Sequence, residues 1–301
     1  MENLKNPIHT INKSDRVGIM KNLTFLLFGF AILCFSALSH GQEVCNLEDV
    51  NIDKPILAIA ECLGEHDPVI REKAYDGLVT LLRGGGVSGA VTRDLLQKCT
   101  GFLQSGDDES GFLKPYAALC ITEVARTDRI APHFNEGERA NIVKTATAYL
   151  KSITDYRGFD DVEGWRHGVA HTADVLMQLS LNDQINIDHH HEMLAAIASQ
   201  ISPQDHFYIY GEPVRLARPV MFMAMQGKIS EQEWSNWFAD ISNPTPEMEN
   251  WNEAFSSNAG LAKRHNLTAF LSALQLNTST SDNENLKAIM PGLTAALQRV
   301  P

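Results

Sequence analysis

Residues 67–86 read DPVIREKAYDGLVTLLRGGG, and this stretch predicts one complete amphipathic helix. Asp67 and Pro68 open it with a proline in the first turn, where proline loses no helical hydrogen bond. Three consecutive glycines end it, because glycine disfavours a continuing helix. The expected helix is Val69–Arg83, and one apolar face contains the residues Ile70, Ala74, Leu78 and Leu81.

The rest of the chain repeats this pattern, helix after helix, with almost no strand alternation. Ser230 and Glu233 form a capping box, which marks the start of a helix. Further helices are expected over Gly89–Leu103, Ser110–Ala125, Asn135–Leu150, Val162–Leu181, His189–Ile201 (capped by Asp188), Glu212–Gln226, Trp234–Asp240, Asn250–Leu276 and Glu284–Arg299. The prediction is an all-α fold of stacked antiparallel helix pairs, a solenoid of the HEAT or armadillo kind, with a closed helical bundle as the alternative. Residues 45–301 are expected to form a single domain.

The first forty-one residues are predicted to be a signal peptide with a leading segment. Leu23–Leu38 carry no charge, Lys21 precedes them, and small residues follow up to Gly41, which is the pattern of a secretory signal. The run is shorter than the about 20 residues of a spanning helix. We therefore expect a periplasmic or secreted protein without stable membrane insertion. The alternative is an inner-membrane protein anchored through Leu23–Leu38, and the translation start is either Met1 or Met20.

The charge balance excludes one class of partner. The chain has 25 Lys and Arg against 37 Asp and Glu, a formal net charge of −12. Loss of residues 1–41 removes four basic and two acidic residues and leaves a net charge of −14. A general nucleic-acid binder needs a basic surface, so nucleic acid is not an expected partner.

Four cysteines remain after the predicted cleavage site: Cys45, Cys62, Cys99 and Cys120. An exported protein permits disulfides, and four cysteines allow three pairings. The last three lie in apolar helical surroundings, so buried free thiols are an equal alternative for them. No CxxC motif occurs, which argues against a redox centre or a zinc finger.

The candidate chemistry lies in DYRGFDDVEGWRHGVAHTADVLMQL, residues 155–179. On a helical wheel four polar residues share one stripe: His167, His171, Asp174 and Gln178. Trp165 falls on the opposite face, which is the expected core. The flanks of the stripe are small or apolar, so a neighbouring helix or a ligand has room to approach it.

Three interpretations of this stripe stay open: a buried polar network of structural histidines, a metal or catalytic site, and a solvated face. His167 and His171 have the i, i+4 spacing of helical zinc sites, and Asp174 would be a third ligand to zinc or another divalent metal. Alternatively, Asp174 would not bind the metal but would orient one of the metal-binding imidazoles through a hydrogen bond. The sequence lacks HExxH, because Gly168 follows His167, and therefore lacks the general base of zincin proteases.

Other motifs offer little support for catalysis. No GxSxG, SxxK, GxGxxG or P-loop occurs, so a serine nucleophile or a nucleotide site is not expected. Asp155 and Arg157 precede the stripe, as a local ion pair or with Arg157 as an anion contact. The run Asp188–Glu192 contains three histidines that we expect to be mostly solvated.

At these residues the chain resembles the DUF2785 family, an uncharacterised group of α-helical bacterial proteins. The resemblance rests on DYRGF…GWRHGVAHTADVL, on HDPVIREKAYDGL upstream and on YGEPVRLARPV downstream. It covers about residues 53–241 and leaves C-terminal helices over 246–301. The segment GFLKPYAALCITEV departs from the family at Lys114–Tyr116. The resemblance implies a helical fold and adds Glu212 and Arg215 as candidate pocket residues, without implying a reaction.

Two functions from different classes follow. The first is a binding module that presents a polar groove to a protein, a peptide or a small molecule. The second is a metal-dependent, hydrolase-like protein in which His167, His171 and Asp174, with Glu212 or Asp155, hold a divalent ion that activates water. Whether the protein is an enzyme is left open by the sequence.

Overall fold

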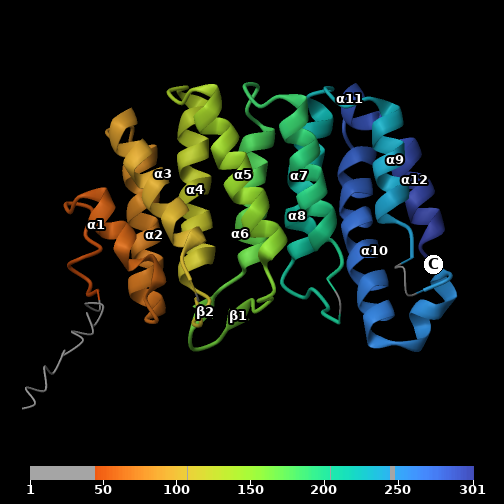
Figure 1. Cartoon of the computed structure of the whole chain (residues 1–301), viewed down its shortest axis with the longest axis horizontal. Coiled ribbons are helices and arrows are strands. Elements are labelled where there is room, and N and C mark those ends of the chain that lie inside the picture. The colour runs from red at the N-terminus through yellow and green to blue at the C-terminus, as the bar shows by residue number, and fades with distance from the viewer. Residues whose placement is uncertain (1–44, 107, 204, 245–247) are drawn as a thin grey trace, which may run out of the picture. The chain divides into compact units, whose positions relative to one another are not determined.

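The computed structural model describes residues 45–106, 108–203, 205–244 and 248–301 (Figure 1). They belong to one compact unit, Glu43–Pro301. The predicted signal peptide lies outside the described residues. Among the helices that are described, none combines the length and the apolar character needed to cross a membrane.

The described residues are predominantly helical, which confirms the predicted all-α class. The helices are α1 (Ile56–Ala60), α2 (Pro68–Arg83), α3 (Gly89–Gln104), α4 (Leu113–Ile130), α5 (Glu136–Ser152), α6 (Gly168–Ser180), α7 (Ile187–Gln200), α8 (Glu212–Met225), α9 (Glu231–Ile241), α10 (Asn258–Ser279), α11 (Glu284–Lys287) and α12 (Met290–Arg299). Two short 3-10 helices cover Glu61–Gly64 and Trp251–Ser256. Two-residue strands, β1 (Phe159–Asp160) and β2 (Gly164–Trp165), form an antiparallel pair.

Side-chain caps define several helix starts as the sequence predicted. The carboxylate of Asp67 accepts the backbone N–H of Val69 at the start of α2. Ser230 and Glu233 form the predicted capping box of α9. The α7 cap is Asn186 instead of Asp188, because the Asn186 side chain accepts the N–H of His189 at 3.0 Å and starts the helix earlier.

Neighbouring helices pack in a regular order within this unit. In one series α2 packs on α4, α4 on α6, α6 on α8 and α8 on α10. Beside it, α3 packs on α4, and α5 packs on both α6 and α7. Figure 1 shows these helices side by side with nearly parallel axes. Helix α6 lies inside this packing, and all of its residues except Met177 are buried.

The helix expected to begin at Val162 begins at Gly168 instead, so the prediction was wrong for residues 162–167. Oδ1 of Asp160 accepts the N–H groups of Val162 and Glu163 at 2.8 and 2.9 Å, which closes a turn. Gly164 and His167 have φ angles of 77° and 59°, in the left-handed region that a continuing helix cannot use. The segment forms β2 and a bend instead of a first helical turn.

The C-terminal helices are also interrupted. The expected helix Asn250–Leu276 is split at Ser257, whose extended backbone separates a 3-10 helix from α10 and whose hydroxyl caps α10 by accepting the N–H of Gly260. The expected helix Glu284–Arg299 consists of α11 and α12. A proline at position 291, in the first turn of α12, is compatible with a fresh helix start.

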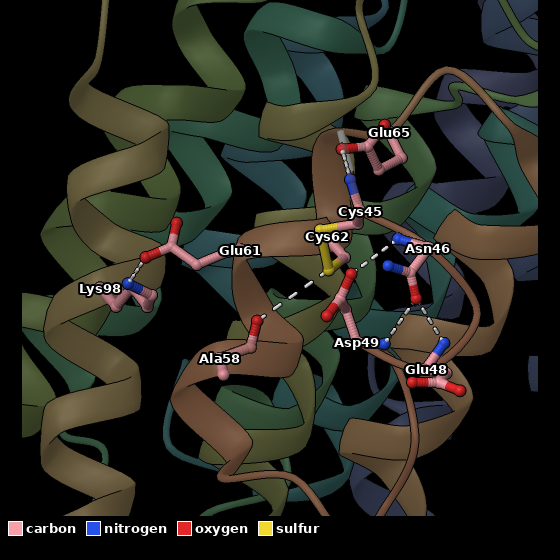
Figure 2. The surroundings of a disulfide bond; sticks show 9 residues. All are labelled: Cys45, Asn46, Glu48, Asp49, Ala58, Glu61, Cys62, Glu65 and Lys98. Carbon is pink, nitrogen blue, oxygen red and sulfur yellow. Dashed lines mark hydrogen bonds and ion pairs between the residues drawn. A yellow bond between two sulfur atoms is a disulfide. The ribbon is translucent and has the colours of Figure 1, made fainter. Parts of the chain in front are cut away.

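One disulfide is present among the described cysteines, so none of the three complete pairings of four cysteines is formed. Cys45 and Cys62 form a disulfide with a Cα–Cα distance of 5.7 Å (Figure 2). The carboxylate of Glu65 accepts the N–H of Cys45 at 3.0 Å and further secures this segment. Cys99 and Cys120 are buried free thiols, as one alternative predicted. The same alternative was wrong for Cys62, which is in the disulfide. Burial, together with the adjacent Cys99, raises the pKa of Cys120, which makes it a poor nucleophile.

Candidate functional site

The segment between α5 and α6 is held against the starts of α2 and α4 by two arginines. Arg71 is fully buried and donates to the carbonyl oxygen of Glu163 and to two carbonyl oxygens that precede α2. Arg166 donates to the carbonyl oxygen of Ser110 at 2.7 Å and to the carboxylate of Glu163 at 2.9 Å. Their guanidinium carbons lie 3.8 and 4.1 Å from the ring centre of Phe112, in cation–π contact. The hairpin β1–β2 is therefore a fixed part of the fold.

His167 links this hairpin to α8. It precedes α6, and its buried ring stacks on Trp165 with a centroid distance of 4.9 Å. Its Nε2 lies 3.5 Å from Oε1 of Glu212, the first residue of α8. Trp165 was predicted on the core face of a helix; it lies in β2 instead and is half-buried. The left-handed backbone of His167 turns its side chain toward Glu212 and away from a simple helical position.

Glu212 is buried as the partner of His167. Burial raises the pKa of its carboxyl, but the nearby imidazole of His167 and the N–H of Tyr210, which donates to Oε2 at 3.0 Å, act in the other direction. The net result is a pKa below the usual value. Glu212 is therefore a carboxylate at neutral pH, held in place by the N–H of Tyr210 and by its contact with His167.

His171 continues the stripe into the protein. Its ring is 8% exposed, and its centroid lies 5.6 Å from that of His167 and 5.7 Å from that of Tyr116 on α4. Burial, together with the charges of His167 and Arg215, lowers the pKa of His171 to about 3. The imidazole is neutral at physiological pH, and its Nδ1 is buried without a hydrogen-bond partner.

Asp174 forms an ion pair with α8 instead of facing the histidines as an open ligand. Its Oδ2 accepts from Nη1 of Arg215, and its Oδ1 lies 3.9 Å from Nη1 of Arg218. Burial raises the pKa of Asp174 even though Arg215 acts against the shift. One turn further, Gln178 accepts from Arg129 at 3.0 Å. The stripe is thus buried between α4 and α8, so the solvated-face interpretation was wrong.

A divalent metal finds little support in this arrangement. Within the described residues, no three His, Cys, Asp or Glu side chains are grouped so that they would hold a metal ion. A metal at Asp174 would have to displace Arg215 from its carboxylate. The zinc site of His167, His171 and Asp174 stays a prediction, and the arrangement found is the one expected of a buried polar network.

Asp155 and Arg157 form the local ion pair that was predicted as one alternative. Nη2 of Arg157 lies 2.6 Å from Oδ2 of Asp155, and both side chains are nearly half exposed. The pair joins the stripe through the backbone, because the carbonyl oxygen of Arg157 accepts the N–H of His167 at 3.1 Å. Asp155 borders a small cavity of about 170 Å³, together with Lys114 and Arg166.

A larger cavity of about 530 Å³ opens beside the hairpin. Its lining residues are Thr154, Tyr156, Arg157, Gly158, Phe159, Asp160, Glu163, Arg166, His206, Ile209 and Tyr210. A Cβ atom on Gly158 would lie only 2.0 Å from the Tyr210 ring, so glycine permits this ring to pack directly on the backbone. Phe159 and Ile209 are 44% and 71% exposed at the cavity, which gives it an apolar and aromatic entrance.

The structure places six of the eight predicted residues in two contacting groups between the hairpin, α6 and α8: Trp165, His167, His171 and Glu212 in one, and Asp174 with Arg215 in the other. The other two, Asp155 and Arg157, lie beside them. Sequence reasoning missed Arg71, Phe112 and Arg166, which hold the hairpin. A signal was present for Arg166, as a charged residue beside a histidine in the quoted motif, but its partners are distant in the chain.

Comparison with protein-family models matches residues 100–276 to DUF2785, described as a protein of unknown function. The match includes the hairpin, the histidine stripe and α8, and so confirms the predicted family. It begins at residue 100, after the upstream motif HDPVIREKAYDGL, and ends at residue 276, so its range differs from the expected 53–241. No curated protein and no solved structure matches the chain.

Proposed function

The chain belongs to the DUF2785 family, and we propose that it is a binding module whose site is the 530 Å³ cavity beside the hairpin β1–β2. The cavity carries the proposal, because its volume is in the range of ligand pockets and its walls combine aromatic rings with two arginines. Tyr, Trp and Arg are also the residues that contribute most to protein interfaces. The expected ligand is a partner protein or peptide that inserts an apolar anchor side chain.

The network behind the cavity supports a binding role. His167 and Trp165 fix one wall, and Glu212 holds the other wall by accepting the N–H of Tyr210. A site whose walls are fixed before binding loses less entropy on association. The buried ion pairs therefore act as positioning groups for the cavity, and no reacting group is needed to explain them.

We infer that the helices stack as pairs in a HEAT-like solenoid. The order of packing, from α2 through α4, α6 and α8 to α10, supports this arrangement over a closed bundle, since each helix packs on the next but one in the chain. Stacked pairs place successive loops at one end of the stack, where they build an extended binding surface.

We also propose that the protein is exported. Two observations support this: the signal-like residues 1–41 and the disulfide Cys45–Cys62. Disulfides persist in the periplasm and outside the cell and are rare in the cytosol. A mature N-terminus near residue 42, measured by mass spectrometry of the exported protein, would support this proposal, whereas an intact N-terminus on a membrane-bound chain would support the anchored alternative.

The binding proposal is tested by site-specific photocrosslinking in the cells that express the protein. A photoreactive phenylalanine analogue replaces Ile209, which is 71% exposed at the cavity, and in a control chain replaces Leu276, which is 67% exposed on α10. We expect an adduct of one defined mass at Ile209 and none at Leu276. Tyr210→Ala or Arg157→Ala should abolish that adduct. Equal adducts at both positions, or an adduct that neither variant reduces, would contradict the proposal.

A further inference from the structure

A third cavity, of about 580 Å³, lies between α7, α9 and α10 and shares no lining residue with the cavity beside the hairpin. Its lining residues are His191, Leu194, Ala195, Ala198, Ser202, Ile229, Glu233, Asn236, Trp237, Asp240, Ile241 and Lys263. We refer to it as the α7–α9 groove. Its lining includes His191, which belongs to the histidine run Asp188–Glu192. No residue of this run lines the cavity beside the hairpin.

Two helix faces form the walls of the α7–α9 groove. On α7 the lining positions 191, 194, 195 and 198 share one face, as do positions 233, 236, 237, 240 and 241 on α9. The α7 face is small and apolar at Ala195 and Ala198, which leaves room for a ligand. The α9 face presents the Trp237 ring between carboxylates at Glu233 and Asp240.

The charged side chains of the α7–α9 groove differ in whether they have a partner within the protein. Oε1 of Glu233 lies 3.3 Å from Nε2 of His191, and its other oxygen accepts from Ser230. The carboxylate of Asp240 takes part in no hydrogen bond or ion pair among the residues that the structure describes. The ammonium group of Lys263 lies 5.7 Å from the ring centre of Trp251. Asp240 is therefore the acidic group that a ligand would meet.

We propose that the α7–α9 groove binds a small organic cation, an ammonium group on an apolar or aromatic body. The apolar walls would cover the body, and Asp240 would accept a charge-assisted hydrogen bond from the ammonium group. Trp237 lines the groove, and tryptophan is the aromatic residue that attracts cations most strongly. The net charge of −12 favours cations over anions at long range. This site is independent of the hairpin cavity.

The test uses three probes of one shape: 3-phenylpropylammonium, 3-phenylpropanol and 3-phenylpropionate. Their affinities for the full chain are measured by isothermal titration calorimetry. We expect the ammonium probe to bind roughly tenfold more tightly than the alcohol, and the carboxylate more weakly than both. Equal affinities of the ammonium probe and the alcohol, or no binding of the ammonium probe, would overturn the proposal.

Variants of exposed residues locate the binding site. Asp240→Asn should reduce the affinity for the ammonium probe roughly tenfold and leave that for the alcohol unchanged. Asp240→Lys should reverse the preference in favour of the carboxylate probe. Glu231→Gln, an equal loss of charge on α9 outside the groove, is the matched control and should have little effect. Similar losses in Glu231→Gln and Asp240→Asn would reduce the effect to general charge and refute the site.

Trp237→Ala should weaken binding of the ammonium probe and of the alcohol alike, because it removes the wall that both probes contact. Circular dichroism and the thermal midpoint report whether this variant is folded. If it is not folded, the two Asp240 variants still decide the outcome, since Asp240 is exposed. Unchanged affinities in a folded Trp237→Ala protein would contradict the proposal.

Discussion

Replacing His171 with glutamine should make the fold less sensitive to acid. Burial lowers the pKa of His171 to about 3 in the folded protein, whereas a histidine in an unfolded chain titrates near 6.5. At pH 7 the ring is neutral in both states. As the pH falls below 6.5, the unfolded chain binds a proton that the folded protein does not, and the free energy of unfolding decreases until the pH reaches the folded pKa.

The size of the effect follows from the width of that window. Each pH unit within it corresponds to about 1.4 kcal/mol, so His171 should cost about 2 kcal/mol of stability between pH 6.5 and pH 5. His190 is also buried, which lowers its pKa to about 4 and should add a similar loss over the same range. The wild-type protein should thus lose about 4 kcal/mol from the two residues, and His171→Gln about half of that.

The assay is urea unfolding followed by circular dichroism at pH 7 and pH 5. The compared quantity is the stability lost between the two pH values, so the direct cost of the substitution cancels. His66→Gln is the control, because His66 is exposed. Its loss should equal that of the wild type. Equal losses in the wild type and His171→Gln would refute the argument that His171 is held neutral by burial.

Three further predictions concern the framework of the hairpin site and the disulfide. Gly158→Ala should lower the free energy of unfolding by about 2 kcal/mol, because its Cβ would overlap an aromatic ring, while Gly86→Ala, with no atom near its Cβ, should change little in the same urea titration. Arg71→Met should lower the free energy of unfolding by about 3 kcal/mol, because three backbone carbonyl oxygens lose a charged donor. A urea midpoint equal to that of the wild type would contradict this prediction. Reduction of the Cys45–Cys62 bond, which spans 17 residues, should cost about 3 kcal/mol in the wild type and nothing in the double serine variant.

Local patterns in the sequence predicted the helices well where a cap and an apolar face agreed. Helix α2 differs from its expected range by one residue, at Pro68. The prediction failed where residues with special backbone angles followed each other, between Val162 and His167. A wheel drawn through that segment assumes helical geometry, so it could not detect the left-handed angles at Gly164 and His167.

The polar residues of the stripe were identified from spacing alone, and three of them, His171, Asp174 and Gln178, lie on α6, whereas His167 precedes the helix. Spacing did not reveal what faces them. Arg215 and Glu212 are more than thirty positions further along the chain, and their side chains neutralise Asp174 and hold His167. These contacts make the stripe a buried polar network, and a metal at the same residues stays a prediction.

The sequence by itself determined the all-α class, the family and the place of the histidine stripe, because caps, apolar periodicity and motif residues are local properties. Tertiary structure decided which charged side chains lie next to each other in the folded protein. A carboxylate that faces an imidazole is a possible ligand, whereas one that faces a guanidinium is already satisfied, and this difference depends on helices distant in the chain. The cavity beside the hairpin exists for the same reason: its walls come from two separate segments, residues 154–166 and 206–210, that only the folded chain places together.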